Sequence, residues 1–167
     1  LFSSRPDKLR AQTAWLLLGP GTPFIYYGNE IAQPQGSERG DVKHRKPLDW
    51  AAVKRQRDDE TSVWRWHQQL IRLRAQYPSL RRGKAQLLST SAGDRVLTLW
   101  RTHGDDTTIT LFNAQDAPLE SLKVALPAPA SRRRFVLGSG PAQGPDSSAL
   151  EAGSFAPYET KLVSLRP

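Results

Sequence analysis

Cysteine and methionine are both absent from the 167 residues of this chain. Without cysteine the chain forms no disulfide and offers no thiolate, so a metal site would need histidine or carboxylate ligands. The three histidines are too scattered along the sequence for a paired-ligand motif: His44, His67 and His103. We therefore expect no metal ion and no cofactor. Because translation normally starts at methionine and this sequence starts at Leu1, we also expect a piece of a longer protein.

Long apolar runs are missing as well. No stretch approaches the roughly 20 apolar residues that cross a bilayer, and the first residues lack the pattern of a secretory signal peptide. We expect no membrane partner. For a piece of a longer protein, these absences leave the compartment of that protein open.

Acidic residues are fewer than basic residues: the chain has 16 Asp and Glu and 24 Lys and Arg, which gives a net charge of +8. Such a balance can indicate nucleic-acid binding. The basic residues are mostly arginine and are spread along the chain, with no basic helix face that alternates with exposed aromatic residues. We therefore expect solvated arginines and no nucleic-acid partner; a steep salt dependence of DNA or RNA binding would support the alternative.

The first pattern that is present is a helix followed by a buried strand. Asp7 is placed to cap a helix that runs to Leu18, and the glycines and proline of residues 19–21 end it. The run Phe24-Ile25-Tyr26-Tyr27 is unbroken and apolar, which is typical of a strand buried on both faces in an α/β fold. A long polar loop, residues 29–50, follows it. Because loops after such strands form ligand sites, we expect a ligand site here.

The second pattern is a helix with an apolar stripe that ends before Pro78: Val63, Trp66, Leu70, Leu73 and Tyr77. Trp64 and Ile71 widen the stripe, and the polar residues, among them Arg65 and Arg74, are expected to face solvent.

After Gly83 the apolar period changes from 3.6 to 2, which predicts an antiparallel β-sandwich. We thus predict an α/β part, residues 1–83, followed by an all-β domain, residues 84–167. The expected strands are Ala85–Ser89, Val96–Arg101, Thr107–Asn113, Leu119–Leu126, Arg134–Leu137 and Lys161–Leu165.

Three stretches in the expected order resemble one family. Residues 16–31 resemble the pattern LLLxxPGTPFIYYGxEIG of the eighth barrel strand in the α-amylase superfamily, glycoside hydrolase family 13. Residues 41–50 resemble its D-x-x-x-R-x-P-M-x-W segment, with Leu48 in place of Met, and residues 70–83 resemble L-I-x-L-R-x-x-x-P-x-L-x-x-G. Residues 110–113 and 156–163 resemble, more weakly, strands of the family's C-terminal β-domain.

The resemblance implies the end of a TIM (β/α)8 barrel, namely helix seven, strand eight and helix eight, followed by the C-terminal β-sandwich domain. It implies a retaining enzyme that acts on α-glucosidic bonds of α-glucans or oligosaccharides, by hydrolysis or by glucosyl transfer. The family's catalytic Asp, Glu and Asp belong to strands four, five and seven, and none of their motifs occurs in this sequence. We expect them upstream of Leu1, so this chain alone should be inactive.

Among the residues present, the resemblance makes Arg45 the main substrate-binding candidate, because it matches the Arg that reaches the closed end of the sugar pocket in exo-acting members. An arginine fork suits carboxylates and vicinal hydroxyls, although Arg45 could instead only pin the loop. His44 and Glu30 are weaker candidates for sugar contacts. Tyr26 and Tyr27 are expected in the barrel core or at the substrate, and Trp50 is expected to anchor the loop. Some family members bind calcium before this region, so we expect none here.

Two further expectations accompany this reading. The chain could instead be a non-catalytic β-sandwich module that binds carbohydrate or stabilises a partner domain. If it is the end of a barrel, the run 24–27 should lack its neighbouring strands, because those belong to a missing N-terminal barrel segment. Residues 84–167 should then hold together alone, whereas residues 1–50 should be poorly defined.

Overall fold

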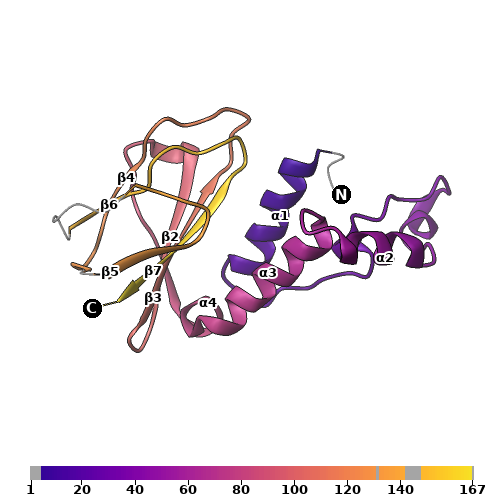
Figure 1. Cartoon of the computed structure of the whole chain (residues 1–167), viewed down its shortest axis with the longest axis horizontal. Coiled ribbons are helices and arrows are strands. Elements are labelled where there is room, and N and C mark those ends of the chain that lie inside the picture. Colours follow the sequence, from indigo (N-terminus) through magenta and orange to yellow (C-terminus); the bar gives the residue numbers. More distant parts are fainter. Residues whose placement is uncertain (1–4, 131, 142–147, 167) are drawn as a thin grey trace.

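The structure is a computed structural model that describes residues 5–130, 132–141 and 148–166. Helices fill the first half and antiparallel strands the second, and α1, Pro6–Leu18, lies beside the sheet (Figure 1). The further helices are α2, Trp50–Asp58, α3, Val63–Gln76, and the short α4, Pro78–Arg82. The predicted order, helical elements and then an antiparallel β part, is confirmed.

Helix α1 begins differently from the sequence prediction. Arg5 occupies the N-cap position and Pro6 is the first helical residue, where its fixed φ is favourable. Asp7 is therefore not the cap; it lies inside the first turn, where its carboxylate pairs with Arg5 at 2.5 Å. The helix ends at Leu18 as predicted, and Gly19 N–H closes it by donating to the Trp15 carbonyl at 2.9 Å.

The run 24–27 is the largest departure from the prediction, because the structure assigns it to neither helix nor strand. Phe24 is 86% exposed, and Ile25, Tyr26 and Tyr27 are each at least 40% exposed. A strand buried on both faces needs neighbouring strands and covering helices, and no described strand pairs with this run. In Figure 1 it is an irregular trace that leads from the end of α1 toward α2.

Helix α2 was not predicted, because its first residue belongs to the expected polar loop, residues 29–50, and no element was expected between that loop and Val63. Asp49 caps it, with its carboxylate accepting the Ala52 N–H at 2.9 Å. Trp50 is its first residue and is 73% exposed, so the expectation that Trp50 anchors the loop is wrong within this chain.

Helix α3 matches its prediction in extent and stripe. Ser62 caps it by accepting the Arg65 N–H at 3.1 Å, and the chain turns at Tyr77 into α4. Ile71, expected on the buried stripe, is 47% exposed because no described element covers that side of the helix.

All pairings in the β part are antiparallel. The main sheet has the order β1-β2-β3-β7-β5, and β4 and β6 form a second sheet of two strands. The predicted strand over 119–126 shortens to three residues, and β6 escaped prediction because it is equally short. The bounds are β1 Lys84–Leu87, β2 Val96–His103, β3 Asp106–Asn113, β4 Lys123–Ala125, β5 Arg132–Leu137, β6 Ala149–Glu151 and β7 Thr160–Arg166.

Alternation along the strands builds two cores on opposite faces of the main sheet. One face meets the small sheet, and its core includes Trp100, Ile109, Val124, Leu150 and Val163. The other face meets the helices, and this second core combines residues of α1, α3 and α4 with residues of the sheet: Leu17, Leu18, Leu70, Leu80, Leu99, Phe112 and Leu162. The main sheet is thus covered on both faces.

Two arginines fasten the end of α1. Arg101 of β2 is 2% exposed and donates to the Leu18 and Gly19 carbonyls at 3.2 and 3.1 Å. Arg74 of α3 donates to the Leu17 carbonyl at 2.8 Å and to the Gly21 carbonyl at 2.6 Å. Cations at a helix C-terminus are favoured by the helix dipole and satisfy its last carbonyls. This arginine clamp, Arg74 and Arg101, fixes where the chain leaves α1, and the expectation that Arg74 faces solvent is wrong.

Candidate functional site

A cavity of about 340 Å³ opens where the run 24–27 turns into the polar loop. Two segments enclose it: residues 26–35, and the end of the 3₁₀ helix Gly40–His44. Its lining is aromatic and polar, with Lys43 and His44 as its two basic residues: Tyr26, Tyr27, Gly28, Asn29, Gln33, Pro34, Gln35, Lys43 and His44.

Local turns bring these two segments together. Gly28 has φ +87°, and a Cβ there would come within 3.1 Å of the Gln33 side chain, so the position favours glycine. The Gly28 carbonyl accepts the Gln33 N–H at 2.8 Å. The Gln33 side chain then joins the two ends of the loop, since its amide donates to the Pro47 carbonyl at 3.1 Å and accepts the Asp49 N–H at 2.9 Å.

The two tyrosines form the aromatic side of the cavity. Their ring centroids are 4.6 Å apart with the planes tilted by 42°. The Tyr27 hydroxyl donates to the Lys46 carbonyl at 3.1 Å, which holds its ring against the far end of the loop. Desolvation and the neighbouring Tyr26 raise the pKa of Tyr27 above its ordinary value, while the Arg45 charge acts in the opposite direction. Tyr27 therefore stays a neutral hydroxyl at physiological pH.

The three residues that the sequence singled out lie in two places. His44 lines the cavity. Arg45 follows it, is exposed, and lies within electrostatic reach of Tyr27. Glu30 is separated from both: it belongs to the 3₁₀ turn Asn29–Ile31, which packs on α3, and its charge acts on buried His67 instead.

Gln33 and Lys43 were missed by sequence reasoning. Gln33 makes the hydrogen bonds that shape the loop, yet a single glutamine in a polar stretch carries no periodicity or motif that would mark it. Only the folded loop shows that its side chain reaches residues 46–49.

The cavity is suited to binding rather than to bond cleavage. Aromatic rings beside amide and imidazole groups match a neutral ligand with apolar faces and hydroxyl rims. No carboxylate lines it, whereas a retaining glycosidase needs two carboxyl groups about 5–5.5 Å apart. Among the residues described by the structure, no group of three or more His, Cys, Asp or Glu is placed to hold a metal ion.

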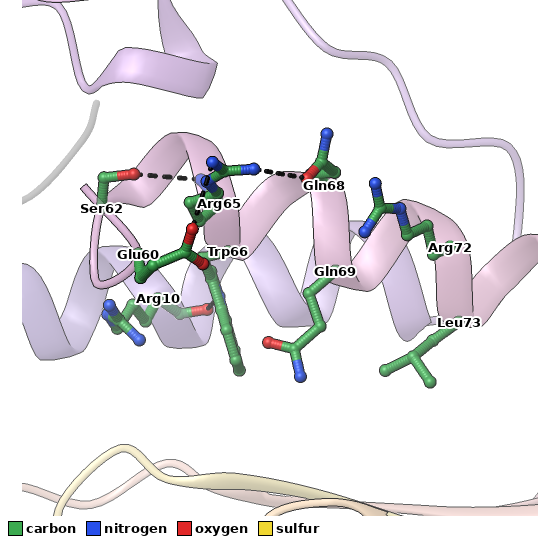
Figure 2. Close-up of a pocket in the computed structure, with 9 residues that line it drawn as sticks. All are labelled: Arg10, Glu60, Ser62, Arg65, Trp66, Gln68, Gln69, Arg72 and Leu73. Atoms are coloured by element: carbon green, nitrogen blue, oxygen red, sulfur yellow. Dashed lines mark hydrogen bonds and ion pairs between the residues drawn. The ribbon is translucent and has the colours of Figure 1, made fainter. Parts of the chain in front are cut away.

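A second hollow, beside α1 and α3, is lined mostly by polar side chains, and several of them pair with Arg65 (Figure 2). Arg65 is central: its backbone N–H donates to Ser62, and its guanidinium reaches Gln68 at 3.3 Å and Glu60 at 3.2 Å. Trp66 donates its indole N–H to the Arg10 carbonyl at 3.0 Å. We interpret this hollow as a structural surface that joins the two helices. None of the helices in the described part of the chain has the length and apolar character needed to span a membrane.

Comparisons with known proteins give the relatives of this chain. Over 116 residues, 70% of its length, it is 31% identical to a cyclomaltodextrinase of Geobacillus thermopakistaniensis (strain MAS1), of which it covers 18%. A cyclomaltodextrinase of a Bacillus species is 31% identical over 97 residues, 58% of the chain and 16% of that protein. No protein-family model matches the chain.

The solved α-amylase of Geobacillus thermoleovorans, complexed with acarbose, aligns with 96% of the chain at a TM-score of 0.76 and 25% identity. The chain is a relative of the α-amylase family. It spans less than a fifth of the length of the two cyclomaltodextrinases and 33% of the α-amylase chain. The part of the chain that aligns with the solved α-amylase includes both its helical half and its antiparallel sheet.

Proposed function

We propose that this chain is the C-terminal portion of a retaining glycosidase of the α-amylase family that acts on α-glucosidic bonds of α-glucans or oligosaccharides. The observation that carries the proposal is the cavity at the end of the run 24–27, where two tyrosines and His44 form an aromatic and polar wall without a carboxylate. Such a wall fits a sugar. The relatives support the substrate class, since two are cyclomaltodextrinases and one is an α-amylase complexed with acarbose.

In this proposal residues 1–83 end a (β/α)8 barrel and residues 84–167 form the C-terminal β-domain. Helix α1 is barrel helix seven, the run 24–27 becomes strand eight, and α3 is barrel helix eight. The exposure of Phe24 and Ile25 supports this assignment, because a barrel strand buries both faces only when its neighbours are present. The partner that completes the strand is the earlier part of the same barrel.

The residues of this chain would hold a sugar while other residues cleave it. Tyr26 and Tyr27 offer aromatic faces, and the His44 imidazole can donate to a hydroxyl. The Arg45 guanidinium, next to the wall and exposed, can bind vicinal hydroxyls or pair with a carboxylate from an early barrel loop. Glu30, directed to α3, serves packing more readily than sugar contact. The nucleophile and the acid/base carboxyl groups lie in the part that precedes this chain.

Arg45 gives the sharpest test of the site. In the full polypeptide that contains this chain, Arg45→Met should lower kcat/KM on maltotriose about 100-fold, since a charged hydrogen-bond pair is lost. The control Arg39→Met removes an exposed arginine of the same loop, and it should stay within about twofold. Neither arginine is among the residues that line the cavity, but the Arg45 charge acts on Tyr27 of its wall, and Arg39 is not among the groups that do so. An equal loss of kcat/KM in both variants, or no loss in Arg45→Met, would show that Arg45 does not bind the substrate.

A further inference from the structure

A groove, distinct from the cavity and the hollow described above, lies between α1 and the main sheet, on the helix-covered face. It has a volume of about 390 Å³, within the range of small-molecule sites. One wall is a stripe of α1, with residues spaced three or four apart: Lys8, Ala11, Gln12 and Trp15. The other wall comes from the sheet and from the turn before β7: Leu97, Phe112, Asn113, Ala114 and Tyr158.

Three aromatic rings border this groove. Trp15 is 46% exposed although its helix is packed on both sides, and its ring meets the edge of Phe112 at 5.1 Å between centroids. Tyr158 has φ +57°, a left-handed conformation that is uncommon for a bulky residue. Backbone strain of this kind persists where the surrounding structure imposes it, and it is enriched at functional positions.

The charge around the groove favours a neutral ligand. Of the residues that line it, only Lys8 is charged, and its ammonium lies 5.2 Å from the Tyr158 ring centroid. The neighbouring cation, Arg5, is matched by Asp7 at 2.5 Å and Asp116 at 2.6 Å. An anionic ligand would therefore meet two cations, Lys8 and Arg5, beside two carboxylates and so no net positive charge, whereas a neutral ligand meets rings and hydrogen-bond donors.

We propose that this groove is a binding site for a neutral oligosaccharide, separate from the cavity at residues 26–44. A sugar ring presents an apolar C–H face, which packs on an aromatic ring, and hydroxyls at its rim. Trp15 and Tyr158 supply the rings, and Gln12 and Lys8 supply polar side chains one helical turn apart on the same side of α1. The choice of an α-linked glucan as the ligand rests on the proposed function.

Binding of maltoheptaose to the chain of residues 1–167, measured by titration calorimetry, tests the site. Trp15→Ala should weaken binding about tenfold or more, because it removes the largest of the three rings that border the groove. Tyr158→Gly should weaken binding as well while keeping or raising the melting temperature, since glycine accepts the positive φ without strain. The second variant separates loss of the ligand contact from loss of folding.

Two control variants decide where the sugar sits. Trp50→Ala removes a tryptophan that is 73% exposed and lines neither cavity, and it should leave the affinity within about twofold. Tyr27→Ala disrupts the other cavity, so it should remove any sugar binding there and leave the Trp15-dependent part of the binding in place. Binding that survives Trp15→Ala and Tyr158→Gly, or that is lost in Tyr27→Ala alone, would overturn the groove site, as would the absence of any binding.

The same titration separates this proposal from the proposed function. If the full polypeptide cleaves maltoheptaose while the chain shows no binding that depends on Trp15, the groove proposal fails and the proposed function stands. If Trp15-dependent binding occurs and the full polypeptide cleaves no α-glucan, the groove remains and catalysis is withdrawn. Cellohexaose, a β-linked glucan, should bind more weakly than maltoheptaose; equal binding would overturn the choice of an α-linked ligand.

Discussion

His67 is the residue where the structure adds most to the sequence. In the sequence it is one of three scattered histidines, whereas in the structure it is 3% exposed in α3, with Nδ1 2.9 Å from the Val63 carbonyl. A carbonyl accepts, so Nδ1 carries the proton. Burial lowers the pKa of His67 below its ordinary value of 6.5, against the raising effects of the Val63 hydrogen bond and the Glu30 charge.

A pH dependence of stability follows from the lowered pKa of His67. The unfolded chain takes up a proton near pH 6.5 and the folded chain only at lower pH, so the free energy of unfolding should fall as pH drops below about 6.5. His67→Asn keeps a donor for the Val63 carbonyl but does not titrate. Its urea midpoint should therefore fall less between pH 7.5 and 5.5 than that of the unchanged chain.

If the urea midpoints of the unchanged chain and of His67→Asn fall equally over that pH range, the pH dependence of stability comes from groups other than His67. The carboxyl groups with lowered pKa values, Asp7, Asp59 and Asp116, titrate below their ordinary value of 3.8 and so lie outside this window.

At the scale of elements, the arginine clamp couples three parts of the fold. Arg101→Met should lower the free energy of unfolding by about 2–4 kcal/mol, because it removes two charged hydrogen bonds and leaves the Leu18 and Gly19 carbonyls without these donors. Chemical denaturation measures the loss. Arg82→Met, an exposed arginine of α4, is the matched control and should change stability by less than about 0.5 kcal/mol.

If Arg101→Met unfolds at the same denaturant concentration as Arg82→Met, the clamp does not stabilise the end of α1. A loss in Arg101→Met that is recovered by Arg101→Lys would show that a positive charge suffices without the two-carbonyl geometry of the guanidinium.

The run 24–27 shows why an element can be recognised in the sequence and still be absent from the structure of the chain. Its apolar composition predicts a buried strand, but pairing and burial need neighbouring strands, and no strand of the described residues pairs with this run. By contrast, α3 was predictable because its stripe and its Ser62 cap are local, and β2 and β3 were predictable because eight residues of alternation are long enough to see. The three-residue strand β6 and the hydrogen bonds of the Gln33 side chain to residues 47 and 49 correspond to no local pattern in the sequence.

Hydrogen exchange tests the state of this run directly. None of the backbone N–H groups of residues 24–27 donates a hydrogen bond in the described structure. Their amides should therefore exchange at nearly the rate of an unstructured peptide, while those of residues 108–112 in β3, paired on both sides, should be strongly protected. Strong protection of residues 24–27 in the monomeric chain would contradict this account.

At the scale of the whole molecule, the family was readable from the sequence because residues 16–31, 41–50 and 70–83 match in order. The arrangement of the site was not. His44 and the two tyrosines meet at one cavity, yet Glu30, close to them in the sequence, belongs to a turn that packs on α3, and its charge acts on His67. The expectation that the arginines are solvated is wrong for two of them. Arg101 is buried, and both Arg101 and Arg74 donate hydrogen bonds to backbone carbonyls at the end of α1. Long-range hydrogen bonds of this kind leave no periodic trace.

The proposed division of the molecule has a structural consequence. The second core joins Leu17 and Leu70 of the helical part to Leu99 and Leu162 of the sheet, so the two parts share buried surface. We expect residues 1–83 to depend on the sheet for their folding, whereas residues 84–167 retain their own core around Ile109 and Val163. Comparing hydrogen exchange of the separate β part with that of the full chain checks this.

The central claim is that the chain completes an α-glucan-cleaving barrel. The most direct measurement is the cleavage of maltoheptaose by the full polypeptide encoded by the reading frame that contains residues 1–167, followed by proton NMR of the first products. The account predicts cleavage with the new reducing ends formed initially as α-anomers, as a retaining mechanism requires. No cleavage of any α-glucan, or products formed first as β-anomers, would contradict it.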